Sequence, residues 1–122
     1  MKVIVEREKK VRVAEEVDAI VAGGGIAGVA AAVAAARSQA NVLLIERNGF
    51  VGGVATAGLM ASMGNRFLTG DGRLVVRGIA LEMVERLAES GGTSAGWKSL
   101  LVPKIPFDPE IFKLVLTEMV QE

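Results

Sequence analysis

Three glycines near the start of the chain have a spacing that could serve chemistry, because they satisfy the pattern G-x-G-x-x-G: Gly23-Gly24-Gly25-Ile26-Ala27-Gly28. Gly23 would allow a tight turn after a strand, and Gly25 would let a pyrophosphate approach the backbone without meeting a Cβ atom. Gly28 would let a helix pack closely against the strands. The backbone N–H groups of Ile26 and Ala27 would face the phosphates at the positive end of that helix. The run has no lysine followed by serine or threonine, which excludes a P-loop.

The residues around this run predict the elements that must position it. The apolar residues 17–22 predict a strand buried on both faces, the alanine-rich residues 26–38 predict a helix, and residues 42–45 predict a second buried strand. Such a unit is a right-handed crossover between parallel strands. Glu46 follows the second strand, 18 positions after Gly28. This spacing is typical of a carboxylate that binds an adenosine ribose, and its charge disfavours NADP.

Several interpretations stay open at this point. FAD and NAD both carry an ADP moiety, so the glycine pattern fits a flavoprotein and also an NAD-binding domain of a dehydrogenase or regulator. The turn could also belong to a non-catalytic structural or interaction domain, with Glu46 at a solvated strand end. A second glycine-rich stretch, residues 48–58 with Gly52-Gly53 at its centre, is on its own compatible with an ordinary loop.

Longer motifs resemble the FAD-dependent oxidoreductases of the glutathione-reductase-like flavoprotein superfamily. Those proteins typically show an apolar strand, G-G-G-x-A-G, an alanine-rich helix, L-L-I-E-R and then G-F-x-G-G-x-A-T-x-G. The likeness extends over about residues 11–122, with Ile26 where proline is common and Asn41 in place of a small residue. The matching segments here are Val21-Ala22-Gly23-Gly24-Gly25-Ile26-Ala27-Gly28, Leu43-Leu44-Ile45-Glu46-Arg47, Gly49-Phe50-Val51-Gly52-Gly53-Val54-Ala55-Thr56-Ala57-Gly58 and Phe107-Asp108-Pro109-Glu110.

The resemblance implies a role in FAD binding for residues of both glycine-rich stretches. Glu46 would hold the adenosine ribose, Arg47 would lie against the adenine, and Ala55 or Thr56 would approach the flavin. Glycine backbone and helix-start N–H groups would contact the rest of the cofactor: Gly23, Gly25, Ile26, Ala27, Gly28, Gly52 and Gly53.

The fold class that follows is α/β, a Rossmann-type parallel sheet flanked by helices and incomplete at its C-terminal end. Residues 1–16 are expected to form an N-terminal extension or a loose hairpin, with short strands at 2–5 and 11–14, and residues 17–122 the FAD-binding domain. Helical spacing predicts a helix over 78–90, with a solvated charged face. Residues 93–106 read as an exposed loop, in which Trp97 more often fills a gap in packing than covers a ligand. A last helix follows Asp108 as its cap and Pro109 as its first residue.

Composition and charge exclude several classes of function. Lysine and arginine total 14, as do aspartate and glutamate, so there is no basic surplus for nucleic acid. The absence of cysteine and histidine excludes disulfides, histidine-dependent triads and thiolate or imidazole metal sites. Residues 19–36 carry no charge, but three glycines and many alanines argue against a membrane span. The charged N-terminus argues against a signal peptide, so we expect a cytoplasmic protein.

These observations together predict the N-terminal FAD-binding portion of a longer oxidoreductase. Its small-molecule substrate and its catalytic residues would be determined elsewhere, and we expect this portion to have no specific turnover on its own. A short sheet with an unpaired edge also predicts self-association.

Overall fold

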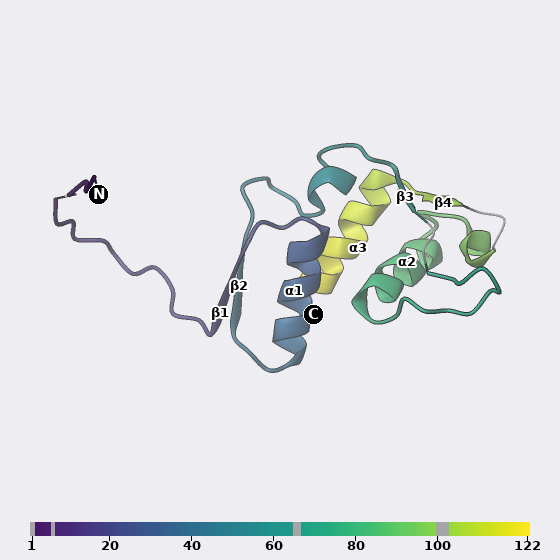
Figure 1. The fold of residues 1–122 in the computed structure, drawn as a ribbon, viewed down its shortest axis with the longest axis horizontal. Coiled ribbons are helices and arrows are strands. Elements are labelled where there is room, and N and C mark those ends of the chain that lie inside the picture. The colour runs from purple at the N-terminus through teal and green to yellow at the C-terminus, as the bar shows by residue number, and fades with distance from the viewer. Residues whose placement is uncertain (1, 6, 65–66, 100–102) are drawn as a thin grey trace.

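The computed structural model describes residues 2–5, 7–64, 67–99 and 103–122 (Figure 1). The elements are β1 (Ala19–Ala22), α1 (Ile26–Arg37), β2 (Val42–Ile45), η1 (Gly53–Ala55), β3 (Ser62–Gly64), α2 (Ile79–Glu89), η2 (Ala95–Lys98), β4 (Lys104–Pro106) and α3 (Pro109–Gln121). The β1–α1–β2 unit comes first, a smaller lobe of short strands and the helix α2 follows, and α3 packs against α1 and α2.

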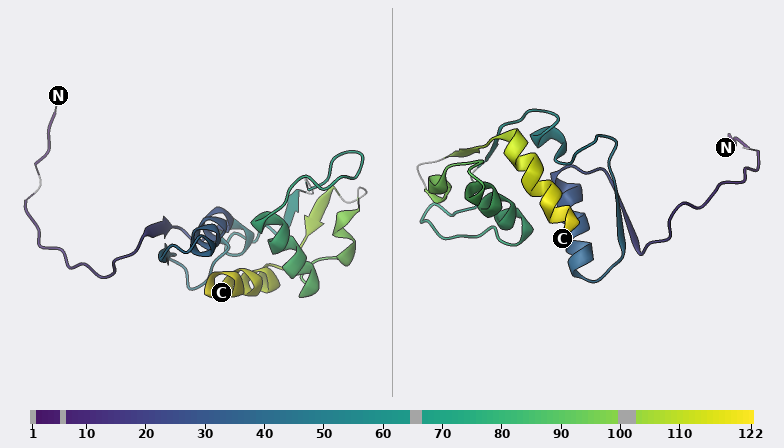
Figure 2. Two further views of the ribbon diagram at one scale, coloured as in Figure 1. Left: turned by 90° about the horizontal axis from the view of Figure 1, so that it is seen from below. Right: turned by 180° about the vertical axis from the view of Figure 1, so that it is seen from behind.

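The β1–α1–β2 unit has the connectivity that the sequence predicts. β1 and β2 are parallel neighbours, with Ala19 opposite Val42 and Ala22 opposite Ile45. The many alanines of α1 favour a helix and let it lie close to the strands and to other helices. Figure 1 and the reverse view in Figure 2 show α1 between the two strands and α3, with α2 beyond α3. The α/β class is therefore confirmed.

The sheet differs from the prediction in one respect, because helices cover only one of its faces in the described part of the chain. Ile20 of β1 is 63% exposed and Ile45 of β2 is 52% exposed. Side chains alternate along a strand, so Ile20 and Ala22 lie on the face opposite Val21. The prediction that both faces of these strands are buried is therefore wrong for this structure, because the described helices lie on the α1 side and leave Ile20 and Ile45 exposed.

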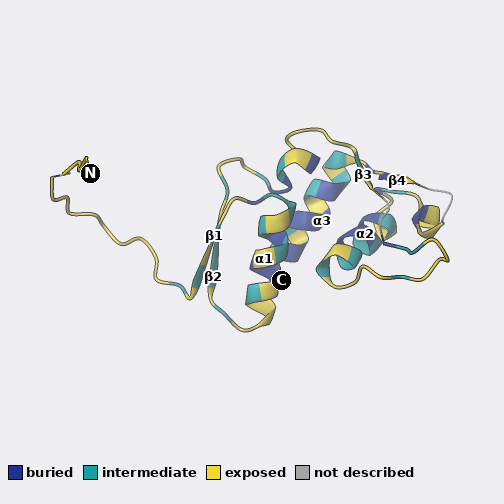
Figure 3. Cartoon of the chain, in the orientation of Figure 1, coloured by how far each residue is buried: buried dark blue, intermediate teal, exposed yellow. Residues whose placement is uncertain are grey.

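The core lies between the helices, where their buried sides face one another (Figure 3). Val29 of α1, Leu87 of α2 and Leu116 of α3 are each 0% exposed and belong to one apolar cluster. α3 begins as predicted, because the Asp108 carboxylate accepts hydrogen bonds from the first-turn N–H groups and Pro109 follows it. This cap fixes the start of α3 relative to the chain that precedes it.

The sequence suggests an exposed loop over residues 93–106, whereas the described residues 93–99 and 103–106 include the short helix η2 and the strand β4; residues 100–102 lie outside the described ranges. The short helix η2 places Trp97 in a second core cluster at 3% exposed, edge-on to the Phe67 ring with 5.3 Å between centroids. β4 then pairs antiparallel with β3 and buries Ile105 completely. Trp97 therefore fills a gap in packing, as one of the two sequence interpretations held.

The N-terminal segment carries no strand in residues 2–5 and 7–17, so the predicted hairpin is wrong. The segment extends away from the helices (Figure 1), and its apolar side chains contact no core cluster. Ile4 and Val11, for example, are 84% and 80% exposed. Without a neighbouring sheet to pair with, an isolated hairpin has little to stabilise it. None of the helices in the described ranges is both long and apolar enough to cross a membrane.

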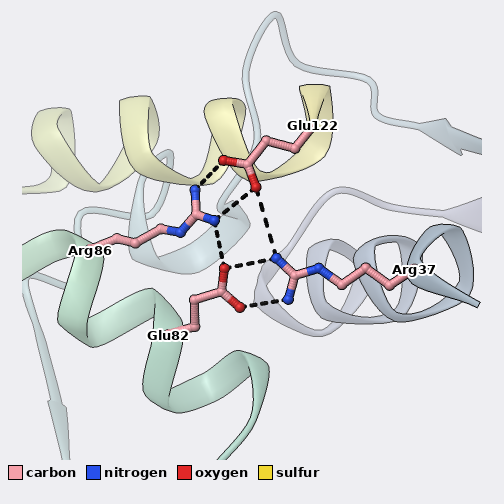
Figure 4. A network of polar contacts seen from close by, with 4 residues as sticks. All are labelled: Arg37, Glu82, Arg86 and Glu122. Carbon is pink, nitrogen blue, oxygen red and sulfur yellow. Dashed lines mark hydrogen bonds and ion pairs between the residues drawn. The ribbon is translucent and has the colours of Figure 1, made fainter.

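Four charged side chains join the three helices in one network (Figure 4). Arg37 of α1 donates to both oxygens of Glu82 on α2 at 2.6 and 2.8 Å, and Arg86 contacts Glu82 at 2.7 Å. Arg86 also pairs with Glu122, at the end of α3. The hydrogen bond from Arg37, more than any other contact, lowers the pKa of Glu82 to about 2. This face of α2 is thus only partly solvated, which corrects the sequence interpretation.

Candidate functional site

The chain turns from β1 into α1 through glycines that differ in what surrounds them. Gly23 has φ 101°, a left-handed conformation that favours glycine, and its N–H donates to the Ile45 carbonyl at 2.8 Å. Gly25 is the N-cap of α1, and no described side chain caps the helix there. A Cβ atom on Gly25 would meet no described atom within 4 Å, whereas one on Gly28 would fall 1.8 Å from the Gly23 oxygen. The tight turn, the open approach and the close packing expected from the sequence are all present.

The start of α1 therefore has the physical character of an anion site. The first N–H groups of an α-helix lack intrahelical partners, and the helix dipole places partial positive charge there. Gly23 and Ala27 are exposed and Gly25 and Ile26 are half-buried, so the chain does not cover this turn with its own atoms. Whether phosphate binds here stays a prediction.

Glu46 lies directly after β2, and its carboxylate turns back toward the glycine turn. One oxygen accepts the Gly24 N–H at 2.7 Å, and the other accepts the backbone and side-chain N–H groups of Asn48 at 2.9 and 2.8 Å. The Asn48 backbone N–H, followed by that of Gly24, lowers the pKa of Glu46 below its ordinary value. The carboxylate is therefore ionised at neutral pH and acts as a hydrogen-bond acceptor.

An open hollow of about 320 Å³ lies between the glycine turn and Glu46, lined by Ala22, Gly23, Ile45, Glu46 and Arg47. It is at the carboxyl ends of two parallel strands, the place where open α/β sheets bind ligands. Arg47 is exposed at its edge, as expected for a side chain that could lie against a ligand.

Gly24 is a site residue that the sequence interpretation missed. The motif leaves its position free, yet a Cβ atom on Gly24 would lie 3.0 Å from Val51 and 3.1 Å from two atoms of Glu46. Gly24 is buried, and its N–H fixes the orientation of the Glu46 carboxylate. The only signal in the sequence is that the free position of the motif is itself a glycine.

The second glycine pair packs against the first glycine turn, backbone to backbone. The Gly52 N–H donates to the Gly24 carbonyl at 2.7 Å, and a Cβ atom on Gly53 would lie 3.0 Å from the Gly25 Cα. Gly52 and Gly53 both have positive φ, at 111° and 55°. The structure therefore brings together the two glycine-rich stretches for which the resemblance implied a role in FAD binding.

Ala55 and Thr56 have their side chains turned inward. The Thr56 hydroxyl donates to the Val51 carbonyl at 2.8 Å, and the residue is 2% exposed. Ala55 is 7% exposed and lines an apolar cavity of about 350 Å³. Thr56 thus stabilises the loop, and an approach of either residue to a flavin stays a prediction.

The apolar cavity and the Glu46 hollow are both lined by residues near the start of α1. Gly23 lines the hollow and Ile26, three residues later, lines the cavity. The remaining lining is almost all apolar or aromatic: Val54, Met60, Ser62, Met63, Gly64, Phe67, Ala80, Met83, Val84, Phe107 and Phe112. The site thus offers an ionised acceptor, an anion-attracting helix start and an apolar space near one another.

Comparison with known proteins assigns the chain to a family. The sequence model of the family described as FAD dependent oxidoreductase matches residues 18–122 of this chain. The chain is also 40% identical, over 101 residues, to the urocanate reductase of Eggerthella lenta, covering 75% of this chain and 16% of that protein. The chain thus corresponds to a small share of this relative's length, and no solved structure matches it. Since the family match covers most of the sequence, the chain belongs to the FAD-dependent oxidoreductase family, and FAD is the cofactor of that family.

Proposed function

We propose that this chain binds the ADP half of FAD within a flavin-dependent oxidoreductase. The observation that carries the proposal is the start of α1, where Gly25 caps the helix without a side chain and has open space before it. A pyrophosphate placed there would accept hydrogen bonds from the N–H groups of Ile26 and Ala27. Its negative charge would be stabilised by the helix dipole, with no basic side chain required.

Glu46 would bind the adenosine ribose in the adjacent hollow. Two carboxylate oxygens offer about four lone-pair positions in all. Two donors of Asn48 engage one oxygen, whereas the Gly24 N–H engages the other. Its remaining capacity could accept a ribose hydroxyl, and Arg47 would lie beside the adenine.

The flavin end of the cofactor would extend toward Gly53 and Ala55, where the apolar cavity opens. When bound, the isoalloxazine ring supplies the redox chemistry, and the protein supplies binding and orientation. Gly52 and Gly53 would bring backbone close to the cofactor on this side. The whole protein would act on a small-molecule substrate, and the described residues of this chain would contribute cofactor binding.

A substitution at Gly25 tests this site, with Gly70 as the matched control. A Cβ atom at either glycine would meet no described atom within 4 Å, so Gly25→Val and Gly70→Val should both fold. We expect Gly70→Val to retain the flavin absorbance of the wild type at about 450 nm after purification with FAD. Gly25→Val should lose it, because the added side chain occupies the pyrophosphate position. Flavin retention by Gly25→Val equal to that of Gly70→Val would contradict the proposal.

We further propose that copies of this chain self-associate through the open face of the β1–β2 sheet. Ile20 and Ile45 expose apolar surface there, and uncovered apolar surface favours association. Light scattering at increasing concentration should show a mass above that of the monomer, and Ile20→Lys should lower it. A monomeric wild type at high concentration would count against this proposal.

A further inference from the structure

We propose that Lys113 of α3 is a positioning residue for the cofactor site, which it serves by holding Phe50. Phe50 lies in the loop between Glu46 and Gly52, the two residues through which that loop contacts the first glycine turn. The inference rests on the proposed FAD site, because it assigns Lys113 the role of keeping this loop in the conformation that binds FAD.

The contact is a cation over an aromatic ring. The Lys113 ammonium lies 4.0 Å from the centroid of the Phe50 ring, well within the distance at which the ring attracts a cation. The same ammonium donates to both carboxylate oxygens of Glu110, at 2.9 and 2.8 Å. The Lys113 side chain is only 22% exposed, compared with 75% for Glu110, so water screens the ring contact less than it would on an open surface.

α3 provides a rigid base for Lys113. Asp108 caps the helix through two N–H groups of its first turn. Phe112, next to Lys113 in sequence, is 2% exposed and packs edge-on against Phe107 with 5.0 Å between centroids. A side chain on a packed helix turn has fewer conformations to lose when it makes a contact, so it positions its partner well.

The loop, in contrast, is exposed where it leaves β2. Arg47, Asn48 and Gly49 are all exposed, and Phe50 is half-buried. Hydrogen bonds tie Asn48 to Glu46 on one side of Phe50, and Gly52 to Gly24 on the other. A contact at Phe50 therefore acts on both ends: it limits the motion of the Glu46 carboxylate and that of the Gly52–Gly53 backbone.

A second lysine offers a control of the same chemistry away from this loop. Lys98 lies 5.3 Å from the centroid of the Trp97 ring and pairs with Glu85 at 2.8 Å. Replacing Lys98 with methionine thus removes a comparable contact, while leaving the cofactor loop untouched.

The experiment compares Lys113→Met, Lys113→Arg and Lys98→Met with the wild-type protein. Amide hydrogen exchange without FAD should be roughly two- to fivefold faster at Asn48 and Gly52 in Lys113→Met, from the typical strength of such contacts. The dissociation constant for FAD should rise by a similar factor. Lys113→Arg should restore both values because it keeps a cation, and Lys98→Met should change neither.

Two results would overturn the inference: unchanged exchange at Asn48 and Gly52 in Lys113→Met, or equal acceleration in Lys98→Met. A wild-type protein that failed to bind FAD would instead remove the proposed function. In that case the exchange rates still decide whether Lys113 holds the loop, so the two failures are distinguishable.

Discussion

At its N-terminal end α1 meets glycine backbone, whereas at its C-terminal end it meets charged side chains of two other helices. Gly28 lies so close to Gly23 that no Cβ atom would fit between them. Arg37, the last residue of α1, forms a bidentate pair with Glu82 of α2 and lies 3.9 Å from Glu122. The C-terminal end is thus stabilised by charges within the protein, and a cation there also complements the helix dipole.

The N-terminal end has no such internal partner among the described side chains, since Gly25 caps α1 with backbone alone. Its electrostatic potential remains available to a ligand. The comparison therefore separates an end of α1 that charged side chains of the protein close from an end whose first N–H groups stay open to the proposed ligand. We expect FAD affinity to depend on the glycine end, and the free energy of unfolding to depend on close packing at the glycine end and on charge at the other end.

Gly28→Ala should have the largest effect, because the new Cβ atom would fall 1.8 Å from the Gly23 carbonyl oxygen. This steric clash can be relieved only if α1 moves away from β1. We therefore expect a loss of about 3 kcal/mol or more in the free energy of unfolding. Urea denaturation followed by circular dichroism measures this change.

Gly25→Ala is the matched control for that measurement. Its Cβ atom meets no atom of the described chain within 4 Å, and its φ of −66° suits alanine. We expect its unfolding free energy to stay within about 0.5 kcal/mol of the wild type. Equal destabilisation by Gly25→Ala and Gly28→Ala would refute the distinction between the closely packed Gly28 and the open Gly25.

Glu46→Gln should have the second-largest effect, and this effect should be mainly on the affinity for FAD. Replacing the carboxylate removes the charged acceptor for ribose and for the N–H groups of Gly24 and Asn48. A hydrogen bond to a charged group is typically worth about 1.5–3 kcal/mol, so FAD affinity should fall by roughly ten- to a hundredfold. Titration of the apoprotein with FAD, monitored by flavin fluorescence, gives the dissociation constant.

The control for this substitution is Glu85→Gln, which removes an exposed carboxylate paired with Lys98. It should leave FAD affinity unchanged, because neither residue lines the hollow beside Glu46. A Glu46→Gln protein with wild-type affinity would mean that the ribose is bound elsewhere.

The glycine end of α1 could be predicted from the sequence because its signals are local. A strand, three glycines and an alanine-rich helix follow one another directly, and the helix predicted over 26–38 is found at Ile26–Arg37. The family likeness predicted that Gly52 and Gly53 lie near the cofactor, but neither it nor the spacing predicted the contact of Gly52 with Gly24. The contact of Lys113 with Phe50 joins residues 63 positions apart, and no local pattern indicates it.

The strands of the smaller lobe could not be predicted from a local pattern, although its helix, predicted over 78–90, is found at Ile79–Glu89. β3 and β4 have three residues each, too few to show an alternation of apolar and polar side chains. They also pair over a long separation in sequence, with Ser62 opposite Pro106. Trp97 is buried because Phe67 lies against it, again a distant partner. Residues 2–5 and 11–14 show the opposite case. Their local composition suits a strand, but they form none because no other strand lies beside them.

Glu82→Gln should have the smallest effect, and the effect should depend on pH. The pKa of this carboxyl falls from 4.5 to about 2 in the folded protein, so its ionised form stabilises the fold. Its contribution is therefore complete above about pH 4.5 and is lost as the pH falls toward 2. For partly exposed ion pairs we expect a contribution of about 1 kcal/mol or less.

Urea denaturation of the wild type and Glu82→Gln at pH 7 and at pH values down to about 2 tests this, since the difference between the two proteins should shrink with falling pH. FAD affinity should stay the same in both proteins at pH 7, because Glu82 and Arg37 lie at the opposite end of α1 from the glycine turn. A constant difference in stability across this range would show that the charge of Glu82 does not contribute. A loss of FAD affinity would show that the two ends of α1 are coupled.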